Sequence, residues 1–79
     1  MELLLFGITK DITGANRLTV PVNEGISTVG ALKRWLAQQY PALGKLRSLA
    51  VAVDNEYAKD DQPLTGSNEI ALIPPVSGG

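Results

Sequence analysis

The sequence predicts a single α+β domain, a mixed sheet of four to five strands packed on one main helix. Three observations support this fold class: short segments of strong β-formers near both ends, one segment with the apolar repeat of a helix, and brief polar turns between them. A chain of 79 residues can hold only one hydrophobic core. Residues 1–79 are therefore expected to form one domain, with residues 74–79 as a flexible tail.

The first expected strand is residues 3–8, which are apolar on both alternating faces and therefore belong inside the sheet. Residues 9–16 are polar and turn-rich. In residues 17–22 apolar and other side chains alternate, which predicts a second strand. Pro21 has no N–H group to give to a neighbouring strand, so this second strand is expected at an edge.

The main helix is expected to begin after Ser27 or Thr28, either of which can cap it. Trp35 widens its apolar stripe, and Pro41 is expected to end it because the residue before a proline resists the helical conformation. The apolar positions that follow the 3-to-4-residue repeat of a helix are Val29, Leu32, Leu36 and Tyr40.

The rest of the chain is expected to return to the sheet. Its expected parts are a strand at 49–53, a turn at Asp54-Asn55, a short strand at 56–58, a loop at 59–68 with Leu64 in the core, and a last strand at 69–73. The resulting order, β-β-α-β-β-β, fits a two-layer domain of the β-grasp type. In that arrangement the first and last strands lie side by side and parallel at the centre of the sheet.

Composition excludes several functions. The chain has no cysteine and no histidine, which removes thiolate and imidazole catalysis and nearly every zinc or transition-metal site, so no metal is expected. Seven dispersed basic residues stand against eight acidic ones, so nucleic acid is not an expected partner. The longest apolar run is too short to span a membrane, so no membrane association is expected. A domain without disulfides fits the cytoplasm.

Two local patterns invite a catalytic interpretation, but ordinary structure explains each better. Residues 25–30 have the spacing that opens a phosphate-binding loop, yet Ala31-Leu32 follow where lysine and serine or threonine are required, which favours a turn and a capped helix. The acidic residues Asp54, Glu56, Asp60 and Asp61 are expected to be solvated loop charges that can steer a basic partner, rather than an acid/base pair.

Three apolar residues are candidates for a contact surface, since one helix covers only one face of a sheet in so small a domain. Phe6 is left open between the core and a partner contact. Tyr57 lies on a short strand beside a turn, where exposure would make it an anchor for a partner. Ile73 comes directly before Pro74, where the tail is expected to leave the sheet. The side chain of Ile73 can therefore contact the rim of a partner protein's binding site.

The carboxyl-terminal segment is the most informative part of the sequence: Pro74-Pro75-Val76-Ser77-Gly78-Gly79. The prolines favour an extended approach, and two glycines without Cβ atoms can thread a channel too narrow for other residues. The terminal carboxylate of Gly79 is a poor electrophile at neutral pH and would need activation by another protein. A functional, slender reactive tip is therefore expected.

These residues resemble the small-subunit family of molybdopterin synthase, among the β-grasp sulfur carriers related to ubiquitin. The resemblance spans nearly the whole chain and is most specific in residues 68–79. A second similar stretch is Leu5-Phe6-Gly7 with Lys10-Asp11 and Gly14. Here Lys10, Asp11 and Gly7 stand where arginine, glutamate and alanine are usual, so a bidentate contact by Lys10 is not expected.

The resemblance implies a sulfur donor that is active only together with a larger synthase subunit, in a heterotetramer. An E1-like activating enzyme would use ATP to adenylate Gly79, a sulfur donor protein would convert it to a thiocarboxylate, and the sulfur would pass to the dithiolene of the molybdenum cofactor. No cofactor would be bound by this chain alone. Phe6, Tyr57, Ile73 and Lys10 would contact the partners, and residues 74–78 would carry the reactive Gly79.

Two alternatives share the diglycine end. One is a sulfur carrier of the same fold for another pathway, such as thiazole synthesis for thiamine, although the Pro-Pro-Val-Ser lead-in favours the first interpretation. The other is a ubiquitin-like modifier that becomes joined to lysines of other proteins.

Overall fold

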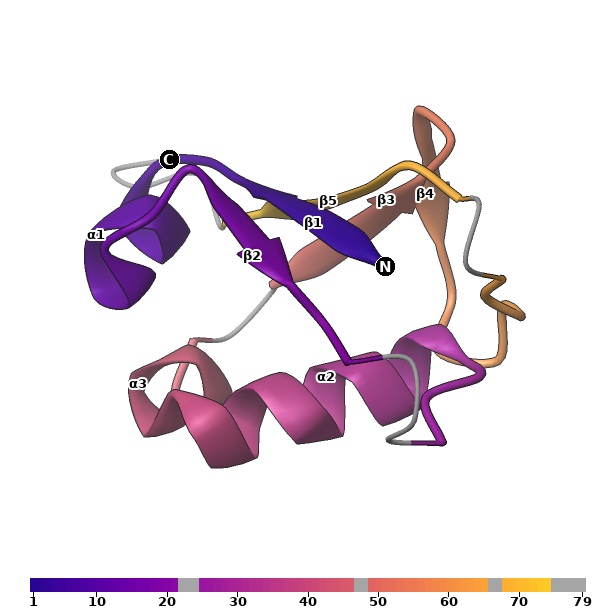
Figure 1. Ribbon diagram of the computed structural model, residues 1–79, viewed down its shortest axis with the longest axis horizontal. Coiled ribbons are helices and arrows are strands. Elements are labelled where there is room, and N and C mark those ends of the chain that lie inside the picture. Colours follow the sequence, from indigo (N-terminus) through magenta and orange to yellow (C-terminus); the bar gives the residue numbers. More distant parts are fainter. Residues whose placement is uncertain (22–24, 47–48, 66–67, 75–79) are drawn as a thin grey trace.

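The computed structural model describes residues 1–21, 25–46, 49–65 and 68–74. Within these residues the strands form one five-stranded sheet in the order β2-β1-β5-β3-β4, and α2 and α3 lie along one side of it (Figure 1). This α+β architecture is the expected β-grasp. The elements are β1 (Glu2–Leu5), α1 (Ile8–Thr13), β2 (Arg17–Thr19), α2 (Val29–Gln39), α3 (Pro41–Gly44), β3 (Ala50–Val53), β4 (Glu56–Ala58) and β5 (Ile70–Ile73).

The centre of the sheet confirms the expected pairing of the first and last strands. β1 and β5 run parallel, with Leu3 opposite Ile70 and Leu5 opposite Leu72. β3 pairs antiparallel with the other side of β5, and β4 returns beside β3 through a turn at Asp54-Asn55. β2 pairs only with β1, as expected for an edge strand, but it stops at Thr19, so Pro21 lies outside it.

The amino-terminal strand is shorter than the sequence predicts, and a helix was missed. β1 ends at Leu5, and Ile8 begins α1 inside the segment expected to be strand and polar turn. The physical reason is a tight turn in which the Thr9 N–H donates to the Phe6 carbonyl at 3.2 Å, directing the chain out of the sheet. A short apolar run fits a strand or a buried helix equally well, so periodicity alone did not separate them.

Helix α2 follows the prediction at its start and departs from it at its end. The Thr28 Oγ1 accepts from the Ala31 N–H at 3.2 Å, so the loop-like spacing of residues 25–30 is a turn and a capped helix. Pro41 stops α2 but also begins the short helix α3, since a proline is well tolerated in the first turn of a helix. No helix in the described ranges is long and apolar enough to cross a membrane.

The hydrophobic core lies between α2 and the inner face of the sheet. Leu43 of α3 closes one end of it, and Leu64, 7% exposed, enters from the loop before β5 as expected. Its members are Leu3, Leu5, Val20, Val29, Leu32, Leu36, Leu43, Val51, Val53, Leu64, Ile70 and Leu72.

Shortening one core side chain tests this packing. Leu36→Ala, at a position 1% exposed, is expected to lower the free energy of unfolding by about 2–5 kcal/mol because it removes buried methyl groups and leaves a cavity. In thermal denaturation followed by circular dichroism, this corresponds to a fall in melting temperature of about 10 °C or more. Gln38→Ala, on the exposed side of the same helix, is the control and is expected to leave the melting temperature almost unchanged.

Candidate functional site

The outer face of the sheet is turned away from α2 and α3 (Figure 1). Strand register places one residue from each of the five strands in a row across this face. That row is Arg17, Leu4, Ala71, Ala52 and Tyr57. Ile73 follows two positions further along β5, and Phe6 lies one residue beyond the end of β1, toward the end of the sheet where the carboxyl-terminal segment leaves.

A shallow hollow lies in the middle of this row. Ala52 and Ala71 form its floor because their methyl groups are short, while Leu4 and Tyr57 stand on either side. We call the set of residues that line it the outer-face patch: Leu4, Phe6, Ala52, Asn55, Tyr57, Glu69, Ala71 and Ile73. An open apolar patch of this kind, rimmed by polar groups, is typical of a protein-binding surface.

All three apolar contact residues expected from the sequence lie in this patch. Tyr57 is 77% exposed, which agrees with the expected anchor role, and Ile73 is half-buried at the last position of β5. Phe6 is 49% exposed and takes no part in the core, which resolves the choice that the sequence left open. Phe6 and Tyr57, which are separated in sequence by strands β2 and β3, thus lie on the same face.

Charged groups surround the patch unevenly. Glu69 and the β3–β4 turn lie along one side. On the other side Lys10, exposed on α1, and Arg17, on β2, line a neighbouring hollow with Phe6 and Leu4. The Arg17 guanidinium lies 3.7 Å from the Glu2 carboxylate. Lys10 therefore lies beside the expected contact surface.

Two of the four acidic residues singled out in the sequence, Asp54 and Asp60, have structural partners. Asp54 and Asn55 both have positive φ, 52° and 69°, which matches the tight hairpin turn that these residue types favour. The Asp54 carboxylate accepts from the Glu69 N–H at 2.9 Å and from the Asn68 amide at 2.8 Å. Asp60 pairs with Lys33. These contacts agree with the expected role as loop charges. Those of Asp54 also hold the hairpin that carries Tyr57 against β5.

One residue at the site was missed from the sequence. Thr9 is fully buried, and its Oγ1 accepts from the Phe6 N–H at 3.0 Å and donates to the Phe6 carbonyl. The hydroxyl thereby fixes the backbone of an exposed contact residue. A threonine following a glycine by two positions is a turn signal, but the apolar neighbours Phe6 and Ile8 masked it.

The carboxyl-terminal segment is described as far as Pro74. Pro74 is half-buried directly after β5, beside the outer-face patch. The remaining expected tail residues, Pro75, Val76, Ser77, Gly78 and Gly79, lie outside the described residues. The structure thus locates where the segment begins, next to Ile73.

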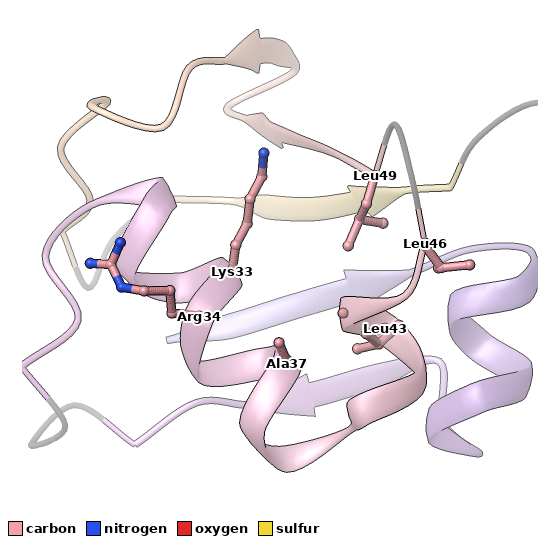
Figure 2. Close-up of a pocket in the computed structure, with 7 residues that line it drawn as sticks. Lys33, Arg34, Ala37, Leu43, Leu46 and Leu49 are labelled. Atoms are coloured by element: carbon pink, nitrogen blue, oxygen red, sulfur yellow. The ribbon is translucent and has the colours of Figure 1, made fainter.

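A second groove lies on the helical side of the domain, between α2, α3 and the segment leading to β3 (Figure 2). Its apolar wall consists of Leu43, Leu46 and Leu49. Figure 2 shows the guanidinium of Arg34 directed away from these leucines, and the Lys33 amine is 2.9 Å from an Asp60 oxygen. The groove lies on the helical side of the sheet, opposite the outer-face patch (Figure 1), so we do not take it as the functional site.

These features define a ubiquitin-like β-grasp protein with an open apolar face beside its carboxyl-terminal segment. The chain belongs to the ThiS family, whose model matches residues 3–79. It is 35% identical over 80 residues to the molybdopterin synthase sulfur carrier subunit of Arabidopsis thaliana, covering all of this chain and 82% of that protein.

Two solved structures extend the comparison. SAMP1 from Haloferax volcanii, a small archaeal modifier protein, superposes with a TM-score of 0.79 at 30% identity, over 99% of this chain and 97% of that one. A chain in the complex of subunits 1 and 2 of the molybdopterin-converting factor from Helicobacter pylori superposes with a TM-score of 0.65 at 24% identity, over 99% and 96% of the two chains. The second likeness concerns the fold alone.

Proposed function

We propose that this chain is the sulfur-carrier subunit of a molybdopterin synthase. The observation that carries the proposal is the 35% identity to a molybdopterin synthase sulfur carrier subunit over the whole chain, together with the family match through residue 79, which includes the diglycine segment. The chain itself is the carrier of the reactive group, and the catalytic side chains belong to its partners. The proposed compartment is the cytoplasm, as expected for a small domain that uses no disulfide.

The proposed chemistry takes place at the carboxyl group of Gly79. An oxygen of the carboxylate attacks the α-phosphorus of ATP, pyrophosphate leaves, and an acyl-adenylate forms. Hydrosulfide, released by a sulfur donor, then attacks the acyl carbon, and AMP leaves with the bonding electron pair. The product is a thiocarboxylate, whose sulfur is the nucleophile for dithiolene formation. No side chain of this domain is required to give or take a proton in these steps.

The outer-face patch is the proposed docking surface for the partners. Phe6, Tyr57 and Ile73 would enter pockets of the larger synthase subunit and of an E1-like activating enzyme, with Lys10 at the rim. The Helicobacter pylori complex supports a two-subunit assembly for a protein of this fold. Because Pro74 lies at the edge of the patch, a protein docked there would receive the following segment directly.

Intact-mass spectrometry tests the carrier function. The full-length protein, incubated with an E1-like activating enzyme, ATP and a sulfur donor, is expected to gain the mass difference between one sulfur and one oxygen atom. Omission of ATP is the control and is expected to leave the mass unchanged. An unchanged mass in the complete mixture, with a known carrier converted in parallel, contradicts the proposal.

A second candidate function is favoured by the likeness to the archaeal modifier protein. In this alternative the activated Gly79 forms an isopeptide bond with a lysine of another protein. The two functions differ in the acceptor: sulfide for the carrier, an amine for the modifier. Peptide mass spectrometry of cells that express a tagged chain distinguishes them, because the modifier leaves a diglycine-containing remnant on acceptor lysines.

A further inference from the structure

The turn between β1 and α1 touches the first residue of the carboxyl-terminal segment. Gly7 has φ 56° and ψ −133°, values close to the first central position of a type II′ turn, which glycine dominates. A Cβ atom built on Gly7 would lie 3.0 Å from Cγ and 4.0 Å from Cβ of Pro74. The proline ring therefore rests on the open Cα side of Gly7.

Several hydrogen bonds hold the turn that packs against Pro74. Besides the two hydrogen bonds of the Thr9 hydroxyl, the Lys10 N–H donates to the Gly7 carbonyl at 3.1 Å, and the Leu5 N–H donates to the Asn16 carbonyl at 2.9 Å. The buried side chain of Thr9 anchors it to the core. Pro74, in turn, follows Ile73 at the end of the central strand β5. Gly7 and Pro74 thus lie just beyond the ends of the two parallel strands β1 and β5.

We propose that Gly7 is a positioning residue that seats Pro74 and so sets the direction in which the reactive carboxyl-terminal segment leaves the domain. The same turn carries Phe6, so one rigid unit orients both the docking patch and the start of the segment. A partner protein that binds Phe6 would therefore meet the carboxyl-terminal segment in a fixed orientation. Gly7 acts through Pro74 and does not touch the reacting group. This inference rests on the proposed carrier function.

Direction matters because the terminal carboxylate must approach the α-phosphorus of ATP in line with the leaving pyrophosphate. A displacement of about 1 Å by a change far from the chemistry can slow a reaction by about 100-fold. An alanine at position 7 would meet the proline ring and would also strain the local backbone, because its φ is positive. Alanine is usual at this position in the family that the sequence resembles. The loss of activity expected for Gly7→Ala is therefore specific to the turn conformation that this chain adopts.

The functional test compares four variants in an adenylation assay with an activating enzyme, ATP and labelled pyrophosphate. Gly7→Ala is expected to bind the enzyme within about twofold of the wild type but to turn over about tenfold or more slowly. Gly14→Ala is the matched control, since Gly14 also has positive φ but nothing lies within 4 Å of an added Cβ. It is expected to match the wild type in both quantities.

Gly7→Ala/Pro74→Ala separates contact from strain, because alanine at 74 removes the Cγ atom that would clash while leaving the strain at position 7. Relative to Pro74→Ala alone, the loss caused by the change at position 7 is expected to shrink. An undiminished loss in the Pro74→Ala background overturns the proposal. So does wild-type turnover by Gly7→Ala.

A structural measurement keeps the inference separate from the proposed function. In the isolated protein, NMR is expected to show a nuclear Overhauser contact between the Gly7 Hα and the Pro74 Hγ protons. Gly7→Ala is expected to shift the amide resonances of residues 76–79, whereas Gly14→Ala is not. Absence of the contact overturns the positioning role. If the contact is present but the wild type is never adenylated, the proposed carrier function is wrong, whereas the packing of Pro74 against Gly7 is confirmed.

Discussion

Adding a single alanine after Gly79 is expected to abolish sulfur transfer while leaving the melting temperature of the domain almost unchanged. The added residue replaces the reactive carboxylate by an amide and places a Cβ where the proposed channel accepts only glycine. No core residue is affected, since the core lies between α2 and the inner face of the sheet. Thiocarboxylate formation, measured by intact mass, is the assay.

The matched control adds the same alanine before Met1, at the opposite end of the chain. That variant is expected to be converted like the wild type, because the amino terminus lies outside the outer-face patch. Gly78→Val instead adds side-chain bulk to the part of the chain that would enter the proposed channel. This variant is expected not to be converted, for a steric reason, although its terminal carboxylate is intact. Normal conversion of the extended chain would be incompatible with a reactive Gly79, and a large fall in melting temperature would show that the segment is needed for folding.

The second large effect is expected at the docking patch. Phe6→Ala and Tyr57→Ala should each weaken binding to the large synthase subunit by about 1–2 kcal/mol, which is about tenfold in Kd, because exposed aromatic anchors contribute much of the energy of an interface. The double variant Phe6→Ala/Tyr57→Ala should lose more. Titration calorimetry with the purified large subunit measures the affinity, and thermal denaturation checks that the fold is intact.

Ile8→Ala provides the matched control for this experiment. Ile8 is 47% exposed, close to the 49% of Phe6, and follows it by two positions, but it belongs to α1 and does not line the patch. Its replacement is expected to leave the Kd within about twofold. Equal losses from Ile8→Ala and Phe6→Ala would mean that general surface hydrophobicity, rather than the outer-face patch, drives association.

Local sequence patterns were sufficient for the elements whose signals are strong over several residues. The 3-to-4 repeat with Thr28 before it predicted α2, and alternation predicted the edge strand β2. They failed where two signals compete within a few residues. At residues 6–9 the apolar character of Phe6 and Ile8 favoured a strand, whereas Gly7 and Thr9 favoured a turn, and the turn prevailed because its hydrogen bonds are satisfied internally.

The sequence by itself determined the class of domain, the absence of thiolate and imidazole chemistry, and the diglycine end, because these follow from residue types and their local order. Only the tertiary structure decided that Ala52 and Ala71 form an open floor between Leu4 and Tyr57, and that Gly7 supports Pro74. Both depend on the residue register in which β1 pairs with β5. That register joins residues about seventy positions apart and is selected by burial of the whole inner face, which no local pattern records.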